Sequence, residues 1–486
     1  MGAWAQQDKA TKFLWFSFAL LLLIRLLSMG WYPLMDSTEA RYADVARRMV
    51  EKSDWITLWF TDTDPFWGKP PFSFWLTALS FKLFGQNEFA ARLPHFLSSL
   101  GVVALALYPV KNRGKRWILH VSVLLFAALL FMVSSAAVIT DMTLTLGSTL
   151  VMVSVWQLLQ SPENSKSNLQ WHGWMGLGWV IGFLAKGPLV LVVCGAPIFL
   201  WALYQKQLLI LWTRIAWIKG LLGVMLFTLP WYILAELKTP GFLNYFIVGE
   251  HFQRFVDTAW AGDKYGVAHA ETRGEIWFDA FIATLPWPLL LPLLAIIAKI
   301  RSLPKAPSLT LNTQGEHSYW LLWGLWPCVF FTFSGNILWT YVLPGLPALA
   351  ILLAFWTTRI KSSAVEWVLS CGVLATLAGL LFYVDQCRDS DYAYRKVTVS
   401  VVSDYQKRAQ HAEPLYFFGD VPFSASYYTQ GQAKVFHDWA ELPDSAYVVF
   451  DQPNPDAWPA DIRAQLTYQS SHGERQLFLW QKAKTQ

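Results

Sequence analysis

Long apolar runs recur along this chain and constrain its fold more than any other feature. We count eleven candidate spans, most of them about 17–25 residues long, which is enough to cross a bilayer as a helix. The fifth and sixth are short and are separated only by Lys186-Gly187-Pro188. The composition agrees, since the chain is 55% hydrophobic and only 15% charged, which is too apolar for a soluble protein of this length. We expect a mainly α, polytopic membrane protein. The runs lie near residues 12–31, 94–110, 117–138, 143–160, 172–185, 188–204, 215–236, 276–298, 319–334, 340–357 and 366–384.

The Lys and Arg residues predict how these spans are oriented. With a cytoplasmic N-terminus, short basic loops such as 111–116 and 358–365 fall on the cytoplasmic side, as the positive-inside rule requires. The opposite side then receives the long loops 32–93 and 237–275 and the tail 385–486. An odd number of spans also places the termini on opposite sides. We therefore expect a multi-pass protein of the cytoplasmic (inner) membrane with a periplasmic tail.

The first apolar segment is expected to stay in the mature protein. It is too long for a cleaved signal, Arg25 interrupts it, and no small-x-small cleavage site follows. We interpret Arg25 as snorkelling to the outer interface, and a polar cavity is the alternative.

The tail differs in character from residues 1–384, which we assign to the membrane domain. Four short β-rich runs alternate there with polar, helix-compatible stretches. We expect a small soluble α/β domain at 385–486. The runs are Leu415–Phe418, Lys434–His437, Ala446–Phe450 and Leu477–Trp480.

Composition also excludes several functions. The net charge is only +5 and no basic domain is visible, so nucleic acid is not an expected partner. The four Cys, three of them in apolar runs, form neither a disulfide framework nor a paired metal motif.

The first outer loop combines two predicted helices with a group of ionisable residues. Residues 37–52 have an apolar side and a charged side, typical of a helix on the membrane surface. Residues 72–84 form the second helix, which follows two prolines and ends at Gly85. Just before the first helix, Asp36 and Glu39 have the spacing of a capping box. A general base facing a cavity is the other interpretation of Asp36.

Further charged side chains occupy turns on the same side. Lys69 lies between Gly68 and Pro70 and is either a phosphate ligand or a snorkelling interface lysine. Asp141 lies in a tight turn between two spans, where a carboxylate is a functional candidate, and Lys186 repeats this in the next outer turn. We expect Asp36, Asp141, Lys69 and Lys186 to converge on one outer cavity.

Several motifs make the chain resemble the GT-C type glycosyltransferases that use polyprenyl-phosphate sugars. Among these it looks most like bacterial lipid A aminoarabinose transferases and protein O-mannosyltransferases. The matching stretches are Asp36–Met49, Ser53–Trp55, Phe66–Pro71, Asn87–Leu93, Thr140-Asp141, Ala185–Pro188, Glu250–Phe255 and Trp339–Pro347.

The resemblance implies a site in the outer loops. It implies an aspartate base in the first loop, which is Asp36 here, with Glu39 and Asp141 as the other catalytic carboxylates. Cations would stabilise the phosphate leaving group, and we assign Lys69, Arg41 and Lys186 to this role. The substrate-binding candidates on the matching stretches are Tyr42, His251, Arg254 and Tyr341.

Two departures from the family pattern affect these assignments. The family commonly has adjacent Asp-Glu before Arg-Tyr, whereas Ser37 and Thr38 separate Asp36 from Glu39 here. In strict register Thr38 would occupy the base position, and we favour Asp36 because a hydroxyl is a poor base. The aminoarabinose enzymes carry Glu before Lys-Pro, and this chain has Gly68, which argues against that sugar.

The implied reaction is inverting transfer of a sugar from a polyprenyl phosphate to a lipid A-like glycolipid or a protein, at the outer membrane face. Asp36 would deprotonate the acceptor or orient it. No nucleotide-binding Gly-rich loop occurs, which fits a lipid-phosphate donor. No cofactor is required, although a divalent metal between carboxylates is compatible with the residues. A transporter of a lipid-linked or anionic substrate and a non-catalytic scaffold are the alternatives from other classes.

Overall fold

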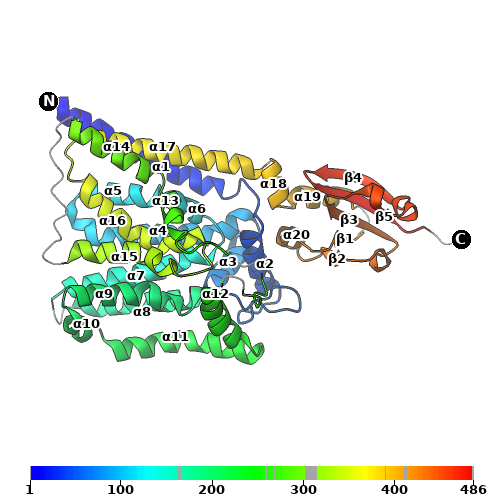
Figure 1. The fold of residues 1–486 in the computed structure, drawn as a ribbon, viewed down its shortest axis with the longest axis horizontal. Helices are drawn as coiled ribbons and strands as arrows, with labels where there is room; N and C mark the ends of the chain where they lie inside the picture. The colour runs from blue at the N-terminus through cyan, green and yellow to red at the C-terminus, as the bar shows by residue number, and fades with distance from the viewer. Residues whose placement is uncertain are drawn as a thin grey trace.

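A bundle of helices makes up most of the chain, and a small sheet lies beyond one end of it (Figure 1). The computed structural model describes residues 2–162, 166–257, 260–265, 270–300, 315–388, 390–409 and 413–483. The helices of the bundle are α1 (Gly2–Ser28), α2 (Thr38–Glu51), α3 (Phe72–Phe84), α4 (Glu88–Leu107), α5 (Lys115–Phe126), α6 (Leu129–Ser134), α7 (Thr140–Gln160), α8 (Lys166–Lys186), α9 (Ala196–Tyr204), α10 (Leu208–Arg214), α11 (Trp217–Lys238), α12 (Arg254–Val256), α13 (Ile276–Ala283), α14 (Trp287–Ile300), α15 (Glu316–Phe331), α16 (Leu346–Thr357) and α17 (Ser363–Arg388). Tighter or wider helical segments are η1 (Tyr108–Arg113), η2 (Leu191–Gly195), η3 (Asn244–Gln253) and η4 (Trp339–Gly345).

Membrane-spanning character is clear for part of this bundle. Within the described residues, six helices are long and apolar enough to cross a bilayer, or up to seven if the bent pair α13–α14 is one span. The run 117–138 is divided between α5 and α6, and α13 meets α14 at 67°. The chain is a multi-pass membrane protein, and the count of eleven spans stays a prediction because several runs fold into shorter or broken helices.

Arg25 does not snorkel, which corrects the interpretation from sequence. Its side chain is buried and donates from Nε to the carbonyl of Met132 (3.1 Å) and from Nη2 to that of Val133 (2.9 Å). These carbonyls belong to the last turn of α6. A cation is favourable at the C-terminal end of a helix, so Arg25 ties α1 to α6.

The C-terminal segment forms the predicted α/β structure. All four β-rich runs are strands, and a further strand, β4, was not predicted. The sheet order is β2-β1-β3-β5-β4, with β1 parallel to β2 and β3, and β5 antiparallel to β3 and β4. We call residues 390–483 the C-terminal unit. It comprises α18 (Asp391–Lys396), α19 (Val399–Arg408), β1 (Leu415–Phe418), α20 (Phe423–Tyr428), β2 (Lys434–Phe436), η5 (Trp439–Glu441), β3 (Ser445–Asp451), η6 (Pro455–Ala457), α21 (Ala460–Arg463), β4 (Leu466–His472) and β5 (Arg475–Gln481).

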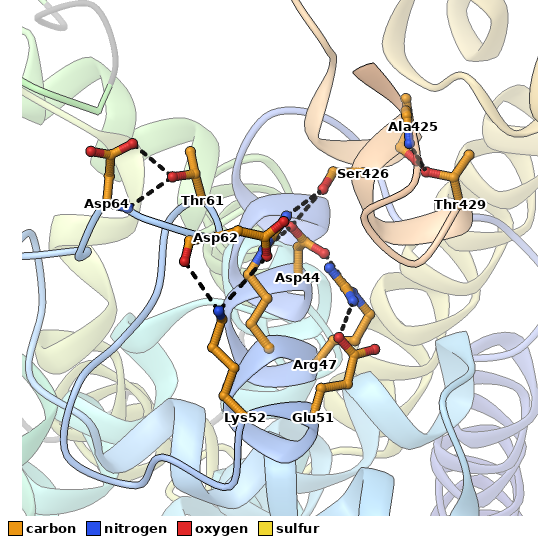
Figure 2. A network of polar contacts seen from close by, with 12 residues as sticks. Asp44, Arg47, Glu51, Lys52, Thr61, Asp62, Asp64, Ala425, Ser426 and Thr429 are labelled. Atoms are coloured by element: carbon orange, nitrogen blue, oxygen red, sulfur yellow. Dashed lines mark hydrogen bonds and ion pairs between the residues drawn. The ribbon is translucent and has the colours of Figure 1, made fainter. Parts of the chain in front are cut away.

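The arrangement of the two ends of the bundle positions the site. The N-terminus lies at one end, and α2, α3 and the C-terminal unit lie at the other (Figure 1). Both predicted helices of the first loop are present, as α2 and α3. The sequence predicted that the charged side of α2 lies on a membrane surface, and this is wrong. Asp44, Arg47 and Arg48 on that side are buried where α20 packs on the helix (Figure 2).

Candidate active site

A cavity of about 840 Å³ opens at the end of the bundle that faces the C-terminal unit. Its walls come from the start of α2, the loop before α3, the first turn of α7, the end of α8, η3 and the segment 330–341. Eight of the ten candidate residues from the sequence line it, and two do not. The eight are Arg41, Tyr42, Lys69, Asp141, Lys186, His251, Arg254 and Tyr341.

Asp36 is the first of the two exceptions. Its carboxylate accepts a hydrogen bond from the backbone N–H of Ser424 (2.8 Å) and another from the Ser424 hydroxyl. Burial raises the pKa of Asp36, and these hydrogen bonds only partly offset the effect. The capping-box prediction is wrong, because the N-cap of α2 is Ser37 and no side chain caps it. Of the four residues expected to converge, Asp36 therefore stays outside, and Thr38 lines the cavity instead.

Glu39 is the second exception, and it binds residues that lie outside the cavity lining. Its carboxylate pairs with Arg92 of α4 (2.8 Å) and accepts from the backbone N–H of Val138 (3.1 Å). Burial opposes ionisation of Glu39, but the charge of Arg92 and the hydrogen bonds from Arg92, Val138 and Met35 together outweigh burial and lower the pKa of Glu39. Arg92 also donates to the carbonyls of Met29 and Tyr32. Glu39 thus joins the loop 32–93 to α4 and to the turn that precedes Asp141.

A network of four charges forms one wall of the cavity. The Lys69 ammonium lies 2.8 Å from Glu250, which also binds Arg254 at 3.0 Å, and Arg254 lies 3.4 Å from Asp263. Burial raises the pKa of Glu250, but the charges of Lys69 and Arg254 outweigh burial and hold this pKa at about 2. Burial likewise opposes the charge on Lys69, but the negative charge of Glu250 favours it, and the pKa of Lys69 is raised. Lys69 lines the cavity, where its ammonium pairs with Glu250.

The cavity lining also carries a second ion pair. Asp141 and Lys186 are 2.7 Å apart, and the Lys186 ammonium lies 5.1 Å from the centre of the Tyr341 ring. His251 is adjacent to the backbone carbonyl of Lys186, with its Nε2 2.9 Å away, and its Nδ1 is 2.7 Å from the carbonyl of Phe246. Burial lowers the pKa of His251. His251 therefore supports the turn that presents Lys186.

Arg41 reaches the cavity from α2 through a group of aromatic rings. Its guanidinium carbon lies 5.2 Å from the ring centre of Tyr42, 5.9 Å from that of Phe66 and 5.5 Å from that of Phe423. One of its Nη atoms donates to the carbonyl of Tyr265. Among the described residues, no acceptor bonds the buried Nε of Arg41 or of Arg254. Buried donors without partners are rare, and guanidinium groups suit phosphate.

Sequence reasoning missed several cavity residues. Glu250 lies inside a recognised motif, but only its neighbours His251 and Arg254 were singled out, although a carboxylate among cations was a usable signal. Asp263 and Asn336 had no such signal, because only folding brings 263 and 336 to the cavity. In the described part of the chain, no three His, Cys, Asp or Glu side chains are grouped to hold a metal.

The fold and the cavity together define a class: a multi-pass helical bundle with a charged cavity at one end, next to a small α/β unit. This is the fold of ArnT from Cupriavidus metallidurans, crystallised with undecaprenyl phosphate. The two superpose with a TM-score of 0.78 at 18% identity, over 96% of this chain and 98% of that one. The apo form gives a TM-score of 0.75.

Sequence comparison gives the same relatives. The dolichyl-phosphate-mannose-protein mannosyltransferase family matches residues 11–246. An undecaprenyl phosphate-alpha-4-amino-4-deoxy-L-arabinose arabinosyl transferase of Shewanella sediminis is 30% identical over 382 residues, covering 75% of this chain and 64% of the relative. A protein of the same name from Yersinia pestis is 28% identical over 403 residues, covering 79% and 68%. The match thus spans about two thirds of these longer relatives, and the resemblance to the GT-C glycosyltransferases is confirmed.

Proposed function

We propose that this protein is an integral membrane glycosyltransferase that moves a sugar from a polyprenyl-phosphate donor to an acceptor at the outer face of the cytoplasmic membrane. One observation carries the proposal: Arg41, Lys69, Lys186 and Arg254 bring four cations to one cavity that also contains Asp141. Two of them, Arg41 and Arg254, have an Nε without an acceptor among the described residues. The names of the relatives, which act on or were crystallised with undecaprenyl-phosphate compounds, support the same donor class.

Charge stabilisation is the main chemical task in this reaction. The leaving group is a lipid phosphate that gains negative charge as the bond from the anomeric carbon to its oxygen breaks. Three of the four cations, Lys69, Arg254 and Lys186, are held by Glu250 or Asp141 before the reaction, so they can stabilise this charge without reorganising. The acceptor attacks the opposite face of the sugar, and the configuration inverts.

Asp141 is the best placed of the three predicted catalytic carboxylates. It lines the cavity, whereas Asp36 and Glu39 do not. The acceptor oxygen would give its proton to Asp141, or would be oriented by it if already ionised. The Lys186 ammonium lies 2.7 Å from this carboxylate. The proposal that Asp36 is the base is weakened by its hydrogen bonds to Ser424. Neither step requires a metal.

Two features of the reaction are argued separately: which sugar is transferred and which molecule accepts it. Gly68 lines the cavity, and a Cβ there would meet the Phe66 ring at 2.9 Å, so the acidic side chain of the aminoarabinose enzymes does not fit without a shift of that ring. The arabinosyl transferase relatives favour a lipid A-like acceptor. The mannosyltransferase family match favours a protein acceptor, and we retain protein O-mannosyl transfer as the second candidate.

A reconstituted assay tests the proposal. Purified protein in lipid nanodiscs is mixed with undecaprenyl-phosphate sugars and with either lipid A or a membrane protein fraction, and the products are identified by mass spectrometry. We expect a mass increase on one acceptor that depends on the lipid-linked sugar. Movement of the lipid-linked sugar across the bilayer without any product would instead support a transporter.

A further inference from the structure

The charged side of α2 is enclosed by the C-terminal unit. The Ser426 hydroxyl of α20 donates a hydrogen bond to Asp44 (2.9 Å), and both residues are labelled in Figure 2. The same hydroxyl accepts a hydrogen bond from Arg48 (3.0 Å). Asp44 also pairs with Arg47 at 2.7 Å and with Arg48 at 3.1 Å. Asp44, Arg47 and Arg48 are all less than a tenth exposed. Buried charges that pair and hydrogen-bond in this way hold two elements in one fixed arrangement.

The same unit holds the chain just before α2. Asp36 accepts from Ser424 as described above, and its own N–H donates to the carbonyl of Lys396 (2.9 Å). The hydroxyl of Tyr428 accepts from the N–H of Leu34 (2.9 Å) and donates to Glu88 of α4 (2.9 Å). The start of α2, which carries Thr38 and Arg41 to the cavity, is therefore positioned by residues almost four hundred positions away in the sequence.

Phe423 extends this contact to a cavity residue. Its ring centre lies 5.5 Å from the guanidinium carbon of Arg41 and 5.5 Å from the Phe60 ring. Tyr42 and Phe66 supply the other rings around Arg41. A guanidinium within about 6 Å of a ring centre is attracted to its face. Phe423 itself does not line the cavity.

We propose that Phe423 is a positioning residue for the donor phosphate, acting through Arg41. This inference rests on the proposed function. Long side chains such as Arg lose much conformational freedom when they are ordered. A ring from the C-terminal unit that fixes the Arg41 guanidinium beforehand lowers this cost when phosphate binds. The C-terminal unit thus completes the site and is not an independent appendage.

A double-mutant cycle tests the inference. Transfer from an undecaprenyl-phosphate sugar is measured for Phe423→Leu, Phe423→Tyr, Arg41→Gln and the double variant Phe423→Leu/Arg41→Gln. We expect Phe423→Leu to raise the donor KM roughly 5-fold or more and Phe423→Tyr to retain the wild-type value, because only the second keeps an aromatic face. In the Arg41→Gln background, Phe423→Leu should have no further effect on KM. The matched control is Phe418→Leu on β1, where the ring is half exposed and the KM should not change.

The outcomes separate this inference from the proposed function. If the wild-type protein transfers no sugar, both the proposed function and the positioning role of Phe423 are overturned. Transfer by the wild type with an unchanged donor KM in Phe423→Leu, or with equal losses in the two backgrounds, overturns the positioning role alone. A lower unfolding temperature with an unchanged KM would also overturn it, since Phe423 would then only stabilise the fold.

Discussion

Single charged side chains in the cavity have more than one partner, and this makes their substitutions informative. Glu250 binds both Lys69 and Arg254, and Asp141 binds Lys186. A substitution in such a network removes a possible ligand of phosphate and also leaves a partner charge without compensation. Matched surface variants are therefore needed as controls.

Lys69→Gln should leave membrane insertion intact and impair use of the donor. Loss of one partner of a buried charge pair costs about 2 kcal/mol or more, so we expect kcat/KM for the lipid-linked sugar to fall roughly 30-fold or more. Lys69→Arg should retain part of the activity. The control is Lys238→Gln, which removes a half-exposed lysine from its ion pair with Asp54 and should change kcat/KM little, since exposed pairs contribute little. Full activity of the Lys69→Gln variant at limiting donor concentration would show that Lys69 does not bind the donor.

Asp36→Asn and Asp141→Asn compare the two candidate bases. Asp141→Asn should lower kcat roughly 10²–10⁴-fold, the usual range for a lost general base. Asp36→Asn keeps an acceptor for one of the two Ser424 hydrogen bonds and should lower kcat far less than Asp141→Asn. Single-turnover rates for both purified variants measure the difference. The reverse order of the two effects would restore Asp36 as the base.

At the scale of elements, short turns determine where the catalytic side chains lie. Lys186 ends α8, and Gly187 follows with a φ of +66°, a conformation that favours glycine. A Cβ at this position would also meet the Phe246 ring at 2.7 Å. The turn that presents Lys186 therefore depends on the absence of a side chain at 187.

Gly187→Ala should lower stability and transfer together. The left-handed backbone costs about 1–2 kcal/mol for a residue with a Cβ, and the contact with Phe246 displaces Lys186 from Asp141. Thermal unfolding in detergent and the transfer assay measure the two effects. Gly173→Ala is the control, because it lies in α8 with open space around its Cβ position and alanine favours a helix interior. Equal unfolding temperatures for the two variants would show that the turn tolerates a side chain.

At the scale of the whole molecule, the two ends of the bundle differ in charge and in content. The cavity, the described parts of the long loops 32–93 and 237–275, and the C-terminal unit gather at one end, opposite the N-terminus (Figure 1). This separation agrees with the Lys and Arg distribution, and we propose that the end with the cavity faces the periplasm.

Cysteine labelling tests this orientation. A cysteine introduced at the exposed Lys407 of α19 should react with a membrane-impermeant maleimide in intact spheroplasts. A cysteine at the exposed Lys111 of η1, predicted to be cytoplasmic, should react only after permeabilisation. The opposite labelling pattern would reverse the orientation and place the cavity in the cytoplasm.

The sequence by itself determined the class of fold, because apolar runs and period-two strands express local physical preferences. The helices α2 and α3, the four predicted strands and eight of the ten candidate site residues follow from such patterns and from the motifs. The resemblance to the GT-C glycosyltransferases also depended only on motifs in the chain.

Only the tertiary structure decided which acids face the cavity. Asp36 and Thr38 are two residues apart, and both acids of the first loop have the spacing of a cap, so no local rule distinguishes a catalytic from a docking carboxylate. Ser424 and Arg92, which bind Asp36 and Glu39, come from distant parts of the chain. Their positions depend on packing between elements, which a local pattern does not encode. For the same reason, only the folded chain revealed that Phe423 approaches Arg41.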